Sequence, residues 1–192
     1  MKRTALTVFA LITSYNLGYC DCPVELSSKI TDVARDLAIN KLSQYFVCSE
    51  ADAENDKAPC NTFAGRGLES IYSVSDFKTP TGYLSANAIW DFVHSSDKWV
   101  SLGNVYNEDN NLCAQAVANQ GNPVIAVMHH PDHGHIVLVI PGDAGKSPKW
   151  NMLVAYSAGF LYHHPEQAYV GKLLSFGYQP DDAKTAEFFY RK

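Results

Sequence analysis

Two stretches of the sequence carry residues that could perform nucleophilic chemistry. The first, PCNTFAGRGLESIY at 59–72, places Cys60 at the expected start of a helix, directly after a proline. A helix N-terminus presents unpaired N–H groups and a partial positive charge, and both favour a thiolate over a thiol. The second, MHHPDHGHIVLVIPG at 128–142, places four histidines within seven positions. Because a cysteine nucleophile needs a base within reach, usually an imidazole, the two stretches together predict a Cys–His pair.

The four histidines of the second stretch lie in two different settings. His135 follows Gly134 and opens an apolar run, so we expect the strand that it begins to hold it beside a helix N-terminus. His135 is therefore the expected base. The other three lie in the preceding loop, where we expect residues at the rim of the site that contact substrate or tune the pKa of His135 through like charge: His129, His130 and His133.

A metal site is the competing interpretation of the same cluster. Zinc is bound by clustered His and Cys side chains, and His163 and His164 would add further ligands. Against this, Pro131 and Asp132 make the cluster a turn, and its spacing does not match the helical His-x-x-x-His arrangement. We therefore expect neither a metal nor another cofactor.

The periodicity of apolar residues predicts the elements that would position this pair. Helical spacing is present in four stretches, and Gly121 ends the last of them: 27–46, 60–72, 83–96 and 110–121. Apolar, β-branched runs predict strands at 123–128, 135–142 and 150–157, with 143–149 as a hairpin loop. A further strand within 169–180 and a terminal strand within 183–192 would extend the sheet. Helices followed by a mostly antiparallel sheet indicate an α+β fold.

The ends and the composition of the chain bound its class. The 192 residues, 46% of them hydrophobic and 18% charged, are enough for one domain with a hydrophobic core. A net charge of −5 argues against a nucleic-acid partner, because phosphate binding needs a basic surface. Lys2 and Arg3 before the apolar run Ala5–Ile12 are typical of a secretory signal peptide. We therefore expect a signal peptide at 1–20, one domain at 21–192, a secreted or periplasmic location, and membrane contact only through the signal peptide.

Cysteine usage fits an oxidising compartment. The five cysteines form an odd set, which leaves at least one thiol unpaired within the whole chain: Cys20, Cys22, Cys48, Cys60 and Cys113. A Cys48–Cys113 or a Cys22–Cys48 disulfide is compatible with this pattern. The sequence does not choose between these pairings.

Both stretches resemble the motifs of a known superfamily. PCNTFAGRGLESIY resembles the Cys-Asn-x-Phe opening of the nucleophile helix in papain-like peptidoglycan amidases, and HGHIVLVIPG resembles the Gly-His strand that carries their base. Between them, CAQAVANQGNPVIAV is similar to their Ala-Gln-x-x-Ala-Asn-x-Gly helix end and first core strand. The nearest groups are the NlpC-like and CHAP families, with the amidase effectors of type VI secretion as relatives. The resemblance covers roughly residues 56–160.

The resemblance implies a papain-like fold and roles for individual residues. Cys60 would be the nucleophile, and His135 the base that later protonates the leaving amine. These families orient the imidazole with a polar side chain on the following strand. A simple hairpin would bring 155–157 opposite His135, so Ser157 is the expected third catalytic residue, ahead of Tyr156 and Asn151, with a backbone carbonyl or a water as the alternative. Backbone N–H groups at the helix start would stabilise the oxyanion.

Two substrate contacts are also expected. Asn61 would either bind substrate or orient the helix start, and His133 would contact substrate at the rim.

The expected function is a secreted cysteine amidase or endopeptidase that cuts the stem peptides of bacterial cell walls through a thioester. Its partners would be the cell-wall peptide and a cognate inhibitor or immunity protein. Three alternatives stay open: an acyltransferase, deamidase or peptidase on another amide; an exported binding or inhibitor domain with Cys60 in a disulfide; and a zinc hydrolase.

Overall fold

The computed structural model of the protein describes residues 22–26, 32–46 and 59–192. The predicted signal peptide at 1–20 lies outside these residues, as do Cys20, Cys48 and most of the polar loop between the first two helices. None of the helices in the described part of the chain has the length and apolar character needed to span a bilayer.

The centre of the fold is a six-stranded sheet in which every neighbouring pair is antiparallel. Its strands, in spatial order, are β3 (Trp99–Asn104), β10 (Ala186–Arg191), β4 (Val124–Met128), β5 (His135–Val139), β8 (Tyr156–Leu161) and β9 (His164–Leu173). The C-terminal strand lies inside the sheet, between β3 and β4. The predicted terminal strand is confirmed, but it lies inside the sheet and does not extend it at an edge.

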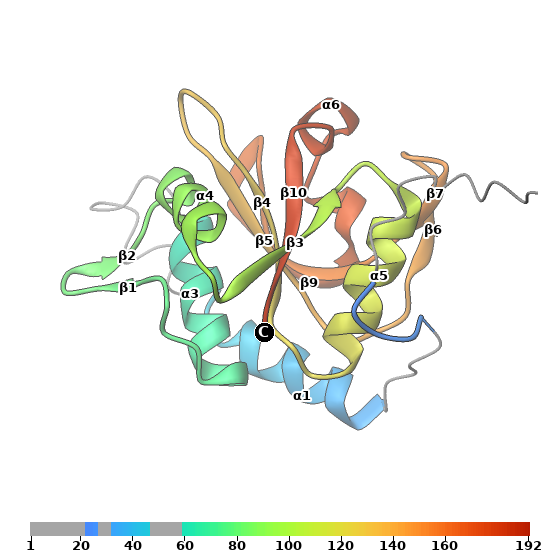
Figure 1. Ribbon diagram of the computed structural model, residues 1–192, viewed down its shortest axis with the longest axis horizontal. Helices are drawn as coiled ribbons and strands as arrows, with labels where there is room; N and C mark the ends of the chain where they lie inside the picture. Colours follow the sequence, from blue (N-terminus) through green and yellow to red (C-terminus); the bar gives the residue numbers. More distant parts are fainter. Residues whose placement is uncertain (1–21, 27–31, 47–58) are drawn as a thin grey trace, which may run out of the picture.

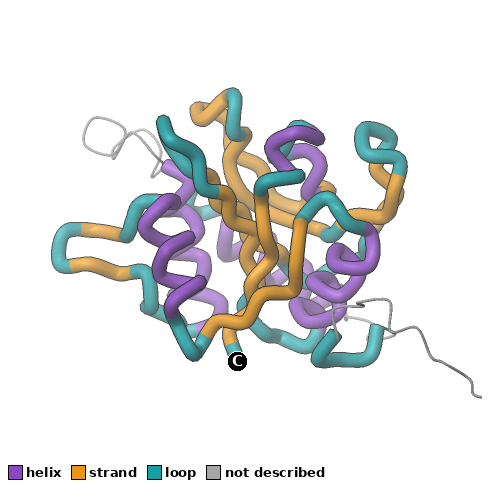
Figure 2. The backbone as a smooth tube through the Cα atoms, turned by 45° about the horizontal axis from the view of Figure 1, so that its top comes forward, coloured by secondary structure: helices purple, strands orange, loops and turns teal. Residues whose placement is uncertain are grey.

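Helices cover both faces of this sheet (Figure 1). On one face lie α1 (Asp32–Ser43), α3 (Pro59–Tyr72) and α4 (Ala86–Ser95), and on the other lies α5 (Glu108–Asn119) with the small β6 (Gly145–Ser147)–β7 (Met152–Val154) sheet. The short hairpin of β1 (Lys78–Thr79) and β2 (Gly82–Tyr83) extends away from the body of the molecule (Figure 2). The chain also forms a 3-10 turn, η1 (Leu174–Phe176), and a short helix, α6 (Pro180–Ala183).

The apolar run of β5 is continuous because both of its faces are covered. Ile136 and Leu138 pack in the cluster that contains α3, whereas Val137 and Val139 pack in the cluster that contains α5. All five residues of the strand are buried. The period of two therefore assigns alternate side chains to two separate hydrophobic layers.

Most of the predicted elements are present, and the α+β class is correct. The predicted third strand at 150–157 is two strands, because β7 at Met152–Val154 pairs with β6 and the strand that pairs with β5, β8, begins only at Tyr156. The segment 143–149 is not a simple hairpin loop, since the chain leaves the sheet there and forms the separate β6–β7 pair. The edge strand β3 was not predicted, because its polar and glycine residues give no apolar run.

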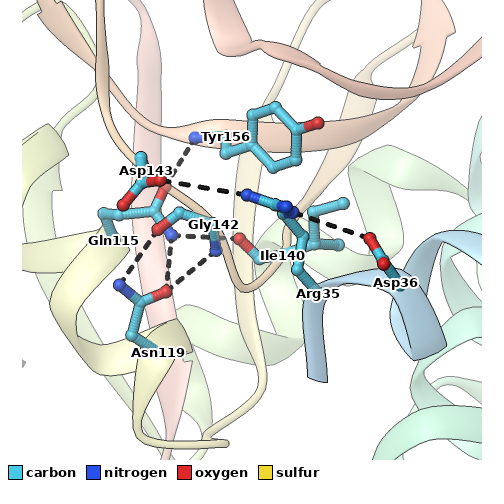
Figure 3. A network of polar contacts seen from close by, with 8 residues as sticks. All are labelled: Arg35, Asp36, Gln115, Asn119, Ile140, Gly142, Asp143 and Tyr156. Carbon is cyan, nitrogen blue, oxygen red and sulfur yellow. Dashed lines mark hydrogen bonds and ion pairs between the residues drawn. The ribbon is translucent and has the colours of Figure 1, made fainter. Parts of the chain in front are cut away.

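A polar clamp on α5 holds the two strands around this excursion. Gln115 donates to the carbonyl of Ile140 at 3.0 Å and accepts from the N–H of Tyr156. Asn119 donates to the carbonyl of Gly142 and accepts from its N–H, both at 3.0 Å (Figure 3). The Ala-Gln-x-x-Ala-Asn motif thus satisfies backbone groups at the end of β5 and the start of β8.

A disulfide joins Cys22 to Cys113 on α5, across 91 positions of the sequence. Neither of the two pairings considered from the sequence is present, so both expectations are wrong. Sequence cannot reveal such a pairing because it depends on which segments meet in space. The disulfide fastens residues 22–26 to the helix that carries the polar clamp.

Reduction of this disulfide is expected to destabilise the fold. Closing so long a loop restricts the unfolded chain and contributes about 3 to 5 kcal/mol to the free energy of unfolding. Thermal melts with and without a reductant should therefore differ by many degrees. A Cys22→Ser/Cys113→Ser variant should have a low melting temperature that does not change when the reductant is added. Equal melting temperatures for the oxidised and reduced protein would contradict the pairing.

Candidate active site

Cys60 is the second residue of α3 and carries a buried thiol, 6% exposed, rather than half of a disulfide. Pro59 begins the helix, where its missing N–H costs nothing. The thiol therefore lies in the first turn, close to backbone N–H groups that lack partners within the helix. Cys60 packs in the same cluster as Ile136 of β5 and Phe160 of β8. The alternative in which Cys60 is disulfide-bonded is wrong.

His135 is the first residue of β5 and is 1% exposed. Its Nε2 is buried and has no hydrogen-bond partner among the described residues. Burial, reinforced by charge on His133 and, more weakly, on His163, lowers the pKa of His135 to about 3, although a hydrogen bond to the backbone of Phe160 opposes this shift. The imidazole is therefore neutral at ordinary pH, the state in which it can accept a proton.

Cys60 packs in the cluster that contains α3, whereas Tyr162 and Tyr178, the aromatic neighbours of His135, belong to the cluster that contains α5. His135 pairs with Met128 and follows that face of the sheet, whereas its neighbour Ile136 faces α3. The ring of Tyr178 lies 4.9 Å from the ring of His135. Burial raises the pKa of Tyr178, and negative charge on Tyr169 and then on Cys60 raises it further. Tyr178 therefore packs against the imidazole of His135.

The buried Nε2 does not hydrogen-bond to the Cys60 thiol in the structure. Catalytic hydrogen bonds are often long or misaligned without substrate and tighten in the complex. An unsatisfied buried nitrogen costs about 1 to 3 kcal/mol, so its presence calls for a functional explanation.

Ser157 does not lie beside His135, and its predicted role is wrong. It pairs with Val139, four residues further along β5, which corresponds to about 13 Å of strand. Its hydroxyl instead donates to the carbonyl of Lys172 at 3.1 Å and lies 3.4 Å from the hydroxyl of Tyr169. The β6–β7 excursion lengthens the connection and shifts the register that a simple hairpin would have had. The backbone of Phe160 takes the place next to the imidazole, which was the alternative left open.

Asn61 is buried, 1% exposed, and its Nδ2 donates to the carbonyl of Leu84 at 2.9 Å. This bond ties the start of α3 to the segment before α4. Of the two expected roles, the structure supports orientation of the helix start.

The loop histidines separate into different surroundings. His129 packs against Trp90 of α4, with ring centroids 6.4 Å apart. His133 is exposed and stacks on Tyr162 at 4.9 Å, and its charge lowers the pKa of His135, as predicted. Across the described ranges, no group of three or more His, Cys, Asp or Glu side chains is placed to hold a metal ion.

Three residues of the site were not found from the sequence: Asn87, Tyr162 and Tyr178. Asn87, in the first turn of α4, donates to the carbonyl of His130 at 2.8 Å and accepts from its N–H. Gly134 packs against Asn87 so closely that an added Cβ would overlap its Oδ1. An asparagine at a helix start is usually a cap, and an isolated tyrosine is usually core, so nothing in the sequence marks these residues.

No known family model matches the chain, and no curated protein matches it either.

Substitution of Asn87 should loosen the loop that leads to His135. Asn87→Ala removes both hydrogen bonds to His130 and is expected to lower the free energy of unfolding by about 1 to 3 kcal/mol. Hydrogen exchange should show faster exchange of the His130 amide. Asn122→Ala, in a different loop, is the matched control and should leave that amide protected. Unchanged protection in Asn87→Ala would show that the brace is not needed.

The buried imidazole should make stability depend on pH between 6.5 and 3. An unfolded histidine titrates near pH 6.5, whereas the pKa of His135 is about 3 in the folded protein, so the unfolded chain binds more protons in this window. The contribution of His135 to the free energy of unfolding should therefore be fully present above pH 6.5. It should decrease as the pH falls, by about 2 to 3 kcal/mol between pH 6.5 and 4.5.

Urea unfolding at pH 6.5 and pH 4.5 measures this loss. His135→Gln should show a smaller difference between the two values, and the exposed-residue control His129→Gln should behave like the unsubstituted protein. An equal loss in His135→Gln would show that His135 is not held neutral by the fold.

Proposed function

We propose that the protein is a papain-like cysteine amidase or endopeptidase in which Cys60 and His135 act as a dyad. The observation that carries this proposal is the presence of a buried thiol in the first turn of α3 together with a buried imidazole at the start of β5, whose Nε2 has no partner among the described residues. The resemblance of 59–72 and 134–142 to the NlpC-like and CHAP motifs supports the same assignment.

The proposed reaction begins with transfer of the Cys60 proton to Nε2 of His135. The thiolate attacks the carbonyl carbon of a substrate amide and forms a tetrahedral oxyanion, which N–H groups at the start of α3 stabilise. The oxyanion collapses to a thioester as His135 donates the proton to the leaving amine. Water, deprotonated by His135, then attacks the thioester and releases the acid, and the proton returns to Cys60.

The substrate proposed is the stem peptide of a bacterial cell wall. The resemblance supports this class of amide, and the Cys22–Cys113 disulfide is consistent with the expected secreted or periplasmic location. A protein inhibitor or immunity protein would then be the natural partner. An acyltransferase, deamidase or other peptidase would use the same two residues on a different amide or acceptor.

Incubation with purified cell-wall fragments, followed by mass spectrometry, tests the proposal and identifies the bond cut. Cys60→Ala should reduce turnover to background, and His135→Ala should lower it by about 10²- to 10⁴-fold, because the attack loses its general base. His130→Ala should cost less than about tenfold, since its ring lies at the rim.

Iodoacetamide labelling of the oxidised protein provides a second measurement, with Cys60 as the expected site. A folded protein in which no thiol reacts would contradict the assignment of Cys60. Activity that survives Cys60→Ala but is lost to chelators would instead favour the zinc hydrolase.

A further inference from the structure

The imidazole of His135 packs against two buried tyrosine rings. The ring of Tyr178 lies 4.9 Å away at an interplanar angle of 74°, and the ring of Tyr162 lies 5.5 Å away at 52°. The two tyrosines are 1% and 8% exposed, respectively. The edge-to-face contact with Tyr178 is a preferred geometry of aromatic pairs and fixes the angle between the two planes. The phenol rings therefore restrict how the imidazole can turn.

One nitrogen of this imidazole is left open to a reacting group. Nε2 has no partner among the described residues, so the hydrogen bond between His135 and the backbone of Phe160 uses Nδ1. Burial lowers the pKa of His135, whereas this bond acts in the opposite direction, so the imidazole is its donor. In the neutral ring the proton therefore lies on Nδ1, and Nε2 offers its lone pair. Rotation of the ring would break this arrangement.

Tyr178 is held both at its hydroxyl and at its backbone. The hydroxyl donates to the carbonyl of Ala126 on β4 at 3.0 Å, in a buried hydrogen bond. The backbone carbonyl of Tyr178 accepts from Nζ of Lys149 at 2.7 Å, and the same ammonium donates to the carbonyl of Ser175 at 3.2 Å. A displacement of the phenol ring would therefore strain or break the bond to Ala126 or the bond to Lys149.

Lys149 comes from the excursion that displaces Ser157. It lies in the connection between β6 and β7, where the chain has left the central sheet. A charged donor makes stronger hydrogen bonds to carbonyls than a neutral one, so Lys149 firmly attaches the segment that carries Tyr178. The excursion that removes Ser157 from the imidazole thus supplies a contact that acts on the imidazole through Tyr178.

We propose that Tyr178 is a positioning residue that holds the imidazole of His135 with Nε2 available to accept the Cys60 proton, and that Lys149 keeps Tyr178 in place. The two residues take the part expected of Ser157, a third side chain that orients the base. The catalytic half of this inference rests on the proposed function, whereas the orientation of the ring does not. The competing explanation is that Lys149 and Tyr178 only stabilise the fold.

Nitrogen NMR of histidine-labelled protein measures the orientation directly. At neutral pH, His135 of the unsubstituted protein should show one tautomer, with the proton on Nδ1. Tyr178→Leu removes the edge-to-face contact, and Lys149→Met removes the ammonium but keeps the aliphatic stem. In both variants the proton should be distributed between Nδ1 and Nε2. Lys149 is exposed, so Lys149→Met decides the outcome if Tyr178→Leu fails to fold. An unchanged tautomer in the folded variants would overturn the inference.

Two matched variants control for the loss of a tyrosine ring and of a lysine. Tyr190→Leu alters β10 far from the imidazole, because Tyr190 pairs with Val124, at the end of β4 opposite to the partner of His135. Lys146→Met removes an exposed ammonium from β6. Both controls should leave the tautomer of His135 and the kinetic constants unchanged.

Kinetics with cell-wall fragments tests the catalytic half. A misplaced base slows proton transfer but leaves the substrate contacts intact. In Tyr178→Leu and Lys149→Met, kcat should therefore fall about tenfold to hundredfold while KM stays constant. Tyr178→Phe keeps the ring and should retain more activity than Tyr178→Leu. An unchanged kcat in Tyr178→Leu and Lys149→Met, or a change confined to KM, would overturn the positioning role.

The two measurements separate this inference from the proposed function. If the unsubstituted protein does not cleave the fragments but the tautomer responds to both variants, the proposed function is wrong and the orientation by Tyr178 stands. If the fragments are cleaved but neither the tautomer nor kcat responds, the inference is wrong and the proposed function stands.

Discussion

The arrangement of the site depends on how two amide side chains of α5 hold the ends of neighbouring strands. Gln115 and Asn119 satisfy backbone groups of Ile140, Gly142 and Tyr156, where the chain leaves the sheet and where it returns. Without these partners, buried N–H and C=O groups would be left unpaired at about 1 to 3 kcal/mol each. The clamp thereby fixes the register between β5 and β8. Continuing that register brings the end of β8 beside the start of β5, where His135 meets Tyr162.

Burial then determines the chemistry that the clamped strands present. A thiol and an imidazole that are both nearly inaccessible favour their neutral forms, because separated charges are costly away from water. In the proposed reaction, the proton would therefore move from Cys60 to His135 as the thiol attacks, and the two groups would not rest as an ion pair. The start of α3 supplies the opposing influence, since its backbone N–H groups favour negative charge where the thiolate and the oxyanion would form.

The sequence predicted what depends on local pattern and failed where distant segments decide the outcome. The helix that begins at Pro59 and the strands β4, β5 and β10 follow from apolar periodicity and from proline chemistry. Ser157 was placed wrongly because Gly, Ser and Pro in 143–149 look like a hairpin loop, whereas the chain forms a separate two-stranded sheet there. Tyr178 and Tyr162 contact His135 only because the fold brings distant segments together, so local sequence patterns could not predict these contacts. The same holds for the disulfide partner of Cys113.

The four histidines at 129–135 are close in sequence but lie in different surroundings, because each contacts a different part of the fold. Asn87 hydrogen-bonds to the backbone of His130, and Trp90 packs against the ring of His129. His135 is buried on β5, where it pairs with Met128. His133 remains at the surface, where its charge still lowers the pKa of His135. His135 is therefore a buried imidazole that the fold keeps neutral, and His133, two residues earlier, is an imidazole open to solvent. Because desolvation and like charge act on His135 in the same direction, an exposed neighbour that gains a proton reinforces the neutrality of the base.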